Sequence, residues 1–183
     1  MDKFQMANEG PWKPAVVNPE LVHWAPPPLG QYKVNSDGAV FANQRKVGLG
    51  VMIHDSNGNV IAALSSPMAG RLGALETEAK AMEVGIRFAL DLDIRDVVVE
   101  CNALAVFNAV QGLATPSSSI LFIVDSILHQ ARWFRSCCFS HTKRQGNVPA
   151  HMLAQYSKSL ASYVAWVECC PSHIEQACAQ DLM

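Results

Sequence analysis

Two acidic residues, Asp37 and Glu78, are the first candidates for chemistry. Asp37 ends the first predicted strand, and Gly38 behind it allows a turn that leaves the carboxylate at the end of the sheet. Glu78 lies four residues before Met82 on a predicted helix, beside the apolar face that must pack on that sheet. A carboxylate there is costly unless it is paired or bound to a metal ion. Taken singly, Asp37 favours a turn cap and Glu78 a helix border.

Two further polar residues lie at the starts of predicted helices. Asn102 follows the β-branched run 97–99, which is typical of a strand covered on both faces, and precedes a helix that begins at Ala103. His151 lies in the first turn of the last predicted helix. By themselves, Asn102 suits a helix cap and His151 an exposed surface position.

The chain is most basic around its last predicted strand. The residues concerned are Arg132, Arg135, His141, Lys143 and Arg144. Such a group can contact a phosphate backbone or can line a solvated strand edge. The net charge of −2 provides no global positive field, so any contact with nucleic acid must be local.

The apolar pattern predicts the elements that position these residues. Alternating side chains predict three strands, of which the second and third form a hairpin through the turn-forming residues 55–59. A crossover helix then makes the next strands parallel. We therefore predict an α/β fold with a five-stranded mixed sheet, antiparallel over its first three strands and then parallel, flanked by helices. The predicted strands are residues 32–37, 47–53, 60–64, 97–99 and 133–141, and the predicted helices are 74–90, 103–111, 119–131 and 150–160.

The predicted elements occupy residues 31–162 as one domain. Proline is frequent in residues 1–30, where it fixes φ and removes backbone donors, so we predict a linker or an extended arm there. Trp12 and Trp24 are candidates for anchoring that arm on the domain. Residues 163–183 form a C-terminal tail whose structure the pattern does not predict.

Four segments are weak signals singly and specific in combination. They are residues 33–39 (KVNSDGA), 78–86 (EAKAMEVGI), 98–103 (VVECNA) and 141–154 (HTKRQGNVPAHMLA). Together they resemble the type 1 ribonuclease H family, and most closely its reverse-transcriptase-like branch that is abundant in plant genomes. The resemblance spans roughly residues 32–160 and implies a ribonuclease H-like fold.

The resemblance also implies a chemistry. In that family four carboxylates hold two Mg²⁺ ions, which activate a water and stabilise the leaving oxygen as RNA is cut opposite DNA. Asp37 and Glu78 match the first two carboxylates, whereas Asn102 and His151 stand where aspartates are expected. The resemblance thus implies Asp37, Glu78 and Asn102 as ligands of Mg²⁺ or Mn²⁺. It adds His151 and His141 to the catalytic set, with His141 assisting proton transfer or product release.

The two replacements predict a weakened site. The Asn102 amide oxygen can ligate but brings no charge, and His151 prefers softer metals than Mg²⁺. We expect loss of the second metal site and a rate lower by about 10²–10³, by analogy with the loss of one preorganised stabilising group.

Three hypotheses of function follow. The first is a domain that binds RNA/DNA hybrid and retains weakened hybrid ribonuclease activity. The second is a non-catalytic nucleic-acid-binding module, and the third is a transposon-derived domain that mediates protein contacts. Whether the protein is an enzyme stays open between them.

Composition, cysteine spacing and the lengths of the apolar runs predict a folded protein without a membrane span. Half of the residues are apolar and 16% are charged, which predicts a folded chain. The six cysteines form no CxxC pair, so we expect reduced thiols in an intracellular protein, with cytoplasm and nucleus not distinguished. No apolar run approaches the length of a membrane span, and we expect no membrane partner and, by default, a monomer.

Overall fold

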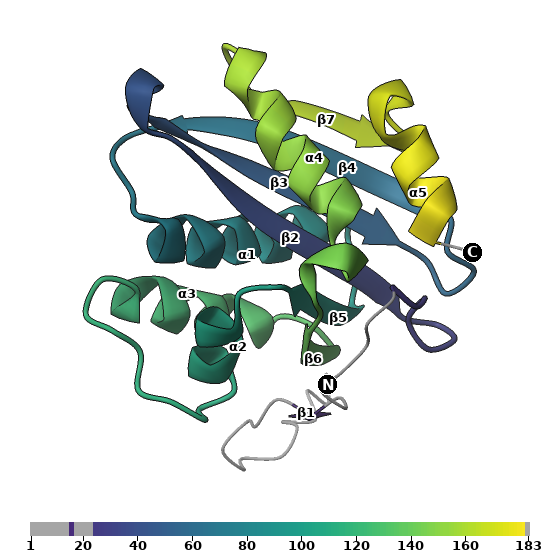
Figure 1. The fold of residues 1–183 in the computed structure, drawn as a ribbon. Coiled ribbons are helices and arrows are strands. Elements are labelled where there is room, and N and C mark those ends of the chain that lie inside the picture. Colours follow the sequence, from purple (N-terminus) through teal and green to yellow (C-terminus); the bar gives the residue numbers. More distant parts are fainter. Residues whose placement is uncertain (1–14, 17–23, 182–183) are drawn as a thin grey trace, which may run out of the picture.

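The described residues build a single mixed sheet with helices on both faces (Figure 1). The computed structural model describes residues 15–16 and 24–181. The strands are β1 (Ala15–Val16), β2 (Tyr32–Phe41), β3 (Lys46–His54), β4 (Val60–Ala69), β5 (Asp96–Cys101), β6 (Ser136–His141) and β7 (Val164–Val167). The helices are α1 (Ala74–Asp91), α2 (Leu104–Val110), α3 (Leu121–Ala131), α4 (Val148–Tyr156) and α5 (Glu175–Asp181). None of the helices in the described part of the chain is long and apolar enough to cross a membrane.

The sheet is wider than predicted. Its order is β1-β6-β5-β2-β3-β4-β7; from β2 through β3 and β4 to β7 each strand is antiparallel to the next, whereas β5 and β6 run parallel to β2. The prediction of five strands was therefore incomplete, because β7 adds to the β4 edge and the two-residue β1 adds to β6. β4 is ten residues long rather than five, and β7 covers part of an edge that would otherwise leave backbone groups unpaired.

Strand β2 continues past the point where the sequence predicted its end. It runs to Phe41, so Asp37 lies inside the strand, where it pairs with Gly50 of β3, and the predicted turn after Asp37 was wrong. Gly38 is required for a different reason. A Cβ at Gly38 would lie 2.8 Å from Thr77 Cγ2 and 2.9 Å from the Thr77 carbonyl carbon, so the glycine lets α1 approach β2.

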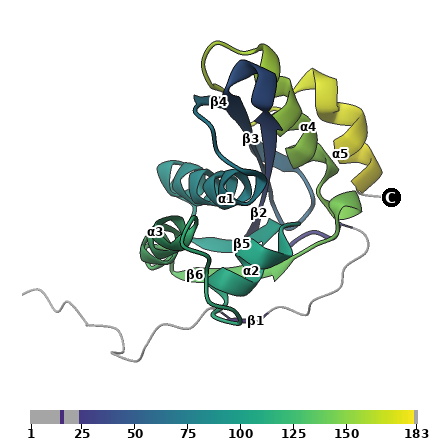
Figure 2. The same ribbon diagram turned by 60° about the vertical axis from the view of Figure 1, so that its left-hand side comes forward.

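The helices divide between the two faces of the sheet, as Figure 2 shows. Helices α1, α2 and α3 cover one face over the main apolar core, which includes Val34, Val51, Ile86 and Phe139. Helices α4 and α5 cover the other face over a smaller cluster that contains Met52, Leu153 and Ile174. The C-terminal tail, for which no structure was predicted, thus contributes β7 to the sheet and α5 to this second layer.

Helix α4 packs with its backbone directly against β3. A Cβ at Gly50 would lie 2.1 Å from the Ala150 carbonyl oxygen and 2.4 Å from the Ala154 nitrogen. A Cβ at Gly48 would lie 2.2 Å from the Ala154 carbonyl oxygen. The two glycines face α4 from alternate positions of one strand, and their lack of side chains sets the depth at which α4 sits.

The end of the predicted arm is tied to the sheet by buried polar contacts. Trp12 lies outside the described residues, whereas Trp24 is buried and its indole N–H donates to Asn35 Oδ1 at 3.0 Å. Asn35 in turn donates to Glu100 Oε1 at 3.0 Å, and Lys33 Nζ donates to Glu100 Oε2 at 3.1 Å and to the Ala25 carbonyl oxygen at 2.6 Å. A buried ion pair is thus satisfied jointly by β2, β5 and the lead-in segment.

The close approach of α4 to β3 makes Gly50→Ala a sharp test. The added methyl group meets backbone atoms that cannot rotate away, so we expect the free energy of unfolding to fall by about 1–3 kcal/mol in urea denaturation. The matched control is Gly85→Ala in α1, whose Cβ would meet only the Val34 side chain at 3.2 Å and the Val51 side chain at 3.5 Å. An unchanged urea midpoint for Gly50→Ala would contradict the packing described here.

Candidate active site

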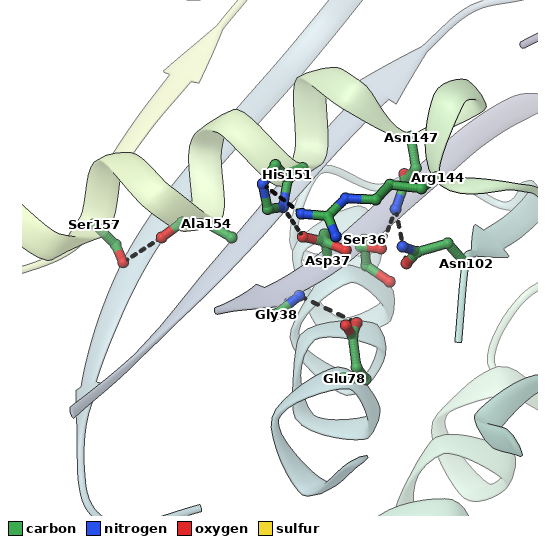
Figure 3. A network of polar contacts seen from close by, with 10 residues as sticks. All are labelled: Ser36, Asp37, Gly38, Glu78, Asn102, Arg144, Asn147, His151, Ala154 and Ser157. Carbon is green, nitrogen blue, oxygen red and sulfur yellow. Dashed lines mark hydrogen bonds and ion pairs between the residues drawn. The ribbon is translucent and has the colours of Figure 1, made fainter. Parts of the chain in front are cut away.

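Strands β2 and β5 separate at the point where the predicted site residues meet. Their parallel pairing ends with Ser36 opposite Cys101, while β2 continues alongside β3. Asp37 is the first residue of β2 beyond this pairing, and Asn102 is the first residue after β5. Side chains from α1 on one face and from α4 on the other reach this place, as Figure 3 shows.

Asp37 is held by a chain of polar contacts from the α4 side. It is 2% exposed, and its Oδ2 lies 2.7 Å from Nδ1 of His151, in the first turn of α4. The opposite ring nitrogen, Nε2 of His151, lies 3.1 Å from the guanidinium of Arg144. Figure 3 shows the three side chains in this order, with the Arg144 head beside Asp37.

Glu78 reaches the same place from α1. Its Oε2 accepts a hydrogen bond of 3.1 Å from the backbone N–H of Gly38. This donor lies in the part of β2 that extends beyond the paired segment of β5. The predicted pair of carboxylates is therefore brought together, with Asp37 approached from the α4 side of the sheet and Glu78 from the α1 side.

The carboxyl groups of Asp37 and Glu78 both have raised pKa values. Burial, and then the nearby Asp37, raise the pKa of Glu78 to about 8. Burial also raises the pKa of Asp37, although the hydrogen bond with His151 and the charge of Arg144 oppose the shift. A bound cation would stabilise both ionised forms, which is what a metal-binding pair of carboxylates requires.

Asn102 is placed by a residue that the sequence reasoning did not single out. Asn147, at the start of α4, donates through Nδ2 to the Ser36 carbonyl oxygen at 2.9 Å and to Asn102 Oδ1 at 3.3 Å. Asn147 is 1% exposed, and its Oδ1 has no hydrogen-bond partner among the described residues. Its position in the segment 141–154 was the signal that could have identified it.

His141 lies at the end of β6, next to the site. Its Nε2 lies 3.3 Å from the carbonyl oxygen of Asn102, and its ring lies 5.8 Å from that of Phe107 in α2. A carbonyl oxygen can only accept, so Nε2 of His141 carries the hydrogen in this contact. His141 therefore contacts the backbone of a predicted ligand rather than either carboxylate.

The predicted basic stretch is divided between the two ends of β6. Arg144 belongs to the site, and Lys143 beside it is exposed. Arg135 directly precedes the first residue of β6, at the end away from the site, and pairs with Asp96. Arg132 is exposed at the end of α3. The structure therefore brings two of the four predicted phosphate-binding cations to the site and leaves two away from it.

A second basic cluster lies beyond the site, at the β2–β3 turn, and was missed by the sequence reasoning. Arg45, Lys46 and Arg71 line a shallow hollow of about 300 Å³, and Lys158 lines its neighbour. Arg45 and Lys46 are adjacent, but Arg71 and Lys158 come from distant segments, so no charge run reveals the cluster. Asp37 lies four residues before the end of β2, so the cluster lies beside the site along the same strand.

The donor set fits one hard cation better than two. Asp37 and Glu78 supply carboxylates and Asn102 an amide oxygen, which are ligand types that Mg²⁺ prefers, and Mg²⁺ is commonly held by one or two carboxylates. Among residues 15–16 and 24–181, no group of three or more His, Cys, Asp and Glu side chains converges on a metal position. Where a fourth carboxylate was expected, His151 instead contacts Asp37.

Comparisons with known proteins agree with this arrangement at the level of fold. The ribonuclease H1 of Halobacterium salinarum superposes with a TM-score of 0.67 at 18% identity, covering 70% of this chain and 98% of that one. The N-terminal ribonuclease H domain of a Mycobacterium tuberculosis protein, solved as a fusion with maltose-binding protein, gives a TM-score of 0.63 at 19% identity, with coverage of 69% and 98%.

A third similar structure contains nucleic acid. The LC11 ribonuclease H1, from a metagenomic compost sample, was solved in complex with an RNA/DNA hybrid and gives a TM-score of 0.63 at 21% identity, covering 69% of this chain and 95% of that one. A search of curated proteins finds no match.

The family follows from the sequence itself. The profile of the reverse transcriptase-like family matches residues 35–157, which extend from just before Asp37 to the end of α4. This range contains Asp37, Glu78, Asn102, His141 and His151, and the fold around them is that of ribonuclease H. The chain therefore belongs to the reverse transcriptase-like family and has the ribonuclease H fold.

Proposed function

We propose that this chain binds RNA/DNA hybrid and hydrolyses its RNA strand slowly, with one divalent metal ion. The observation that carries the proposal is the convergence of Asp37 and Glu78 on one point, where burial raises the pKa of both and the charge of Asp37 raises that of Glu78 further. Burying two neighbouring carboxylates costs free energy that one hydrogen bond each offsets only in part, whereas a bound cation would stabilise both charges. The hybrid bound to the compost ribonuclease H1 supports the same substrate class.

Each polar residue of the site has a distinct role in this proposal. Asp37 and Glu78 bind the ion, and the Asn102 amide oxygen, oriented by Asn147, adds a neutral ligand. The ion, when bound, supplies the positive charge that activates a water and neutralises the phosphate. His141 lies beside the site with its Nε2–H on the Asn102 carbonyl oxygen, and in its imidazolium form it could give the proton at Nδ1 to the leaving oxygen.

The nucleic acid would be held on both sides of the carboxylates. On one side Lys143 and Arg144 follow β6, and on the other Arg45, Arg71 and Lys158 gather near the β2–β3 turn. Cations on both sides of a reacting phosphate suit a substrate that extends past it in both directions. This supports a polynucleotide rather than a small phosphate ester.

A second function is favoured by one specific contact. Because His151 and Arg144 already occupy Asp37 from the α4 side, the domain could bind hybrid without cutting it. A non-catalytic module predicts salt-sensitive hybrid binding with no turnover, whereas the proposed enzyme predicts both binding and turnover.

Cleavage of a labelled RNA/DNA hybrid in Mg²⁺ or Mn²⁺ separates the two functions. We expect slow cleavage by the wild type, none by Asp37→Asn, and an increase of about 10²–10³ for Asn102→Asp, which restores a charged ligand. A double-stranded DNA of the same sequence serves as the substrate control. A silent wild type with activity only in Asn102→Asp would instead indicate the binding module.

Salt-dependent binding of the same hybrid tests the cations near the β2–β3 turn. We expect Arg71→Gln and Lys158→Gln each to weaken binding and to lower the slope of log affinity against log salt by about 1, since each removes one phosphate contact. Arg132→Gln, at the end of α3, is the matched control and should bind like the wild type. The opposite pattern would favour the basic stretch predicted from the sequence.

The raised pKa of Glu78 also predicts a pH dependence of stability in metal-free protein. The folded state binds this proton up to about pH 8, whereas the unfolded state releases it near 4.5. The folded state therefore binds more protons in this range, and its stability falls as pH rises. We expect the free energy of unfolding to decline from pH 6.5 to 8 in the wild type and to decline less in Glu78→Gln. Equal slopes in both proteins would contradict the shift.

A further inference from the structure

The contact between Arg144 and His151 determines which nitrogen of the imidazole carries hydrogen. A guanidinium has no acceptor and stays protonated, so Nε2 of His151, 3.1 Å away, must accept. The ring hydrogen is then on Nδ1, which donates to Asp37 Oδ2 at 2.7 Å. His151 is therefore a neutral connector whose orientation is set from both ends.

This arrangement removes His151 as a metal ligand. The Nε2 lone pair accepts from Arg144, and Nδ1 carries a hydrogen, so neither nitrogen presents a free lone pair. A histidine that bound the metal ion in place of a carboxylate would have shifted the metal preference of the site. Both ring nitrogens of His151, however, are already engaged in hydrogen bonds with Arg144 and Asp37. On the α4 side of Asp37 the chain provides a hydrogen bond and a positive charge instead of a ligand.

The charge of Arg144 acts on the whole pair. It lies near enough to favour the ionised form of both Asp37 and Glu78. One divalent ion, this guanidinium, the two carboxylates and one phosphate diester together carry no net charge. A second divalent ion would leave the same site with an excess of two positive charges, close to a fixed cation.

We propose that Arg144 is a positioning residue that, through His151, replaces one of the two divalent ions of a ribonuclease H site, so that the chain binds a single divalent ion. The proposal rests on the proposed function only in taking Asp37 and Glu78 as the ligands. Arg144 contributes in two ways, since it fixes the hydrogen bond to Asp37 and supplies permanent positive charge.

Mn²⁺ binding, measured by calorimetry without nucleic acid, tests the charge. We expect one Mn²⁺ in the wild type and a dissociation constant about three- to tenfold lower in Arg144→Gln, because a cation that repels the ion has been removed. Arg144→Lys keeps the charge and should stay within about twofold of the wild type. The matched control is Arg95→Gln, which removes an exposed arginine that directly precedes β5, at the end of that strand away from the site.

A second pair of variants tests the replacement itself. His151→Asp alone should still bind one Mn²⁺, because Arg144 pairs with the introduced carboxylate. The double variant Arg144→Gln/His151→Asp restores the carboxylate and removes the competing cation, so we expect a second Mn²⁺ equivalent. Mn²⁺ electron paramagnetic resonance reports coupling between two neighbouring ions and is independent of activity.

Nuclear magnetic resonance of the imidazole nitrogens tests the positioning role. In metal-free wild type, ¹⁵N shifts of His151 should show a protonated Nδ1 and an unprotonated Nε2, and Arg144→Gln should lose this preference. A merely structural arginine would leave the tautomer unchanged.

The outcomes separate this proposal from the proposed function. Two Mn²⁺ ions in the wild type, unchanged or weaker binding in Arg144→Gln, or no Mn²⁺ in any variant would overturn it. A wild type that binds none while Arg144→Gln binds one would also overturn it, because the wild type is expected to bind one ion, and would contradict metal-dependent hydrolysis as well. Failure to cleave hybrid, with the expected Mn²⁺ pattern, would contradict only the proposed function.

Discussion

The site depends on β2 extending past its parallel neighbour β5. Pairing between the two strands stops at Ser36 and Cys101, while β3 holds β2 in place for five more residues. The edge that β5 leaves open provides the Gly38 N–H to Glu78, and the end of β5 delivers Asn102. Had β5 been longer, its backbone would have filled the place where the two carboxylates meet.

The second requirement is the depth at which α4 packs. The helix supplies Asn147 and His151 from its first turn, so their contacts with β2 depend on where its axis lies. That position is set by Gly48 and Gly50, which have no side chain to separate the helix from β3. Two glycines in the strand that pairs with β2, one of them opposite Asp37 itself, thus determine whether His151 reaches Asp37.

The sequence predicted the order of the main elements because their apolar patterns are local. Alternation identified β2, β3 and β4, and helical spacing identified α1; the ends of β3 and α1 were predicted closely, whereas β2 and β4 both run further than predicted. The length of β2 was not predictable from Asp37-Gly38, because a glycine that permits a turn and a glycine that permits close packing look alike in sequence. The short strand β7 was not predicted, because its four residues form a strand only by pairing with the edge of β4.

The carboxylate pair was predicted by position, but its electrostatics were not. Whether Arg144 contacts phosphate or a side chain of its own domain is decided by the fold of residues 141–151, not by the charge run. The cluster of Arg45, Arg71 and Lys158 arises in the same way from three separate segments. Local patterns give elements, whereas clusters assembled from distant segments require the tertiary structure.

The buried pair of Lys33 and Glu100 has a mechanical consequence. Both charges lie on central strands; in the lead-in segment the Ala25 carbonyl accepts from Lys33, and the Trp24 indole donates to Asn35, which in turn donates to Glu100. Detaching that segment would remove the Ala25 carbonyl as a hydrogen-bond acceptor for the buried Lys33 Nζ, whose ion-pair partner is Glu100. A force applied at Trp24 and Ala25 would therefore act first on β2, through Asn35 and Lys33, and would reach β5 only through Glu100, two residues before Asn102.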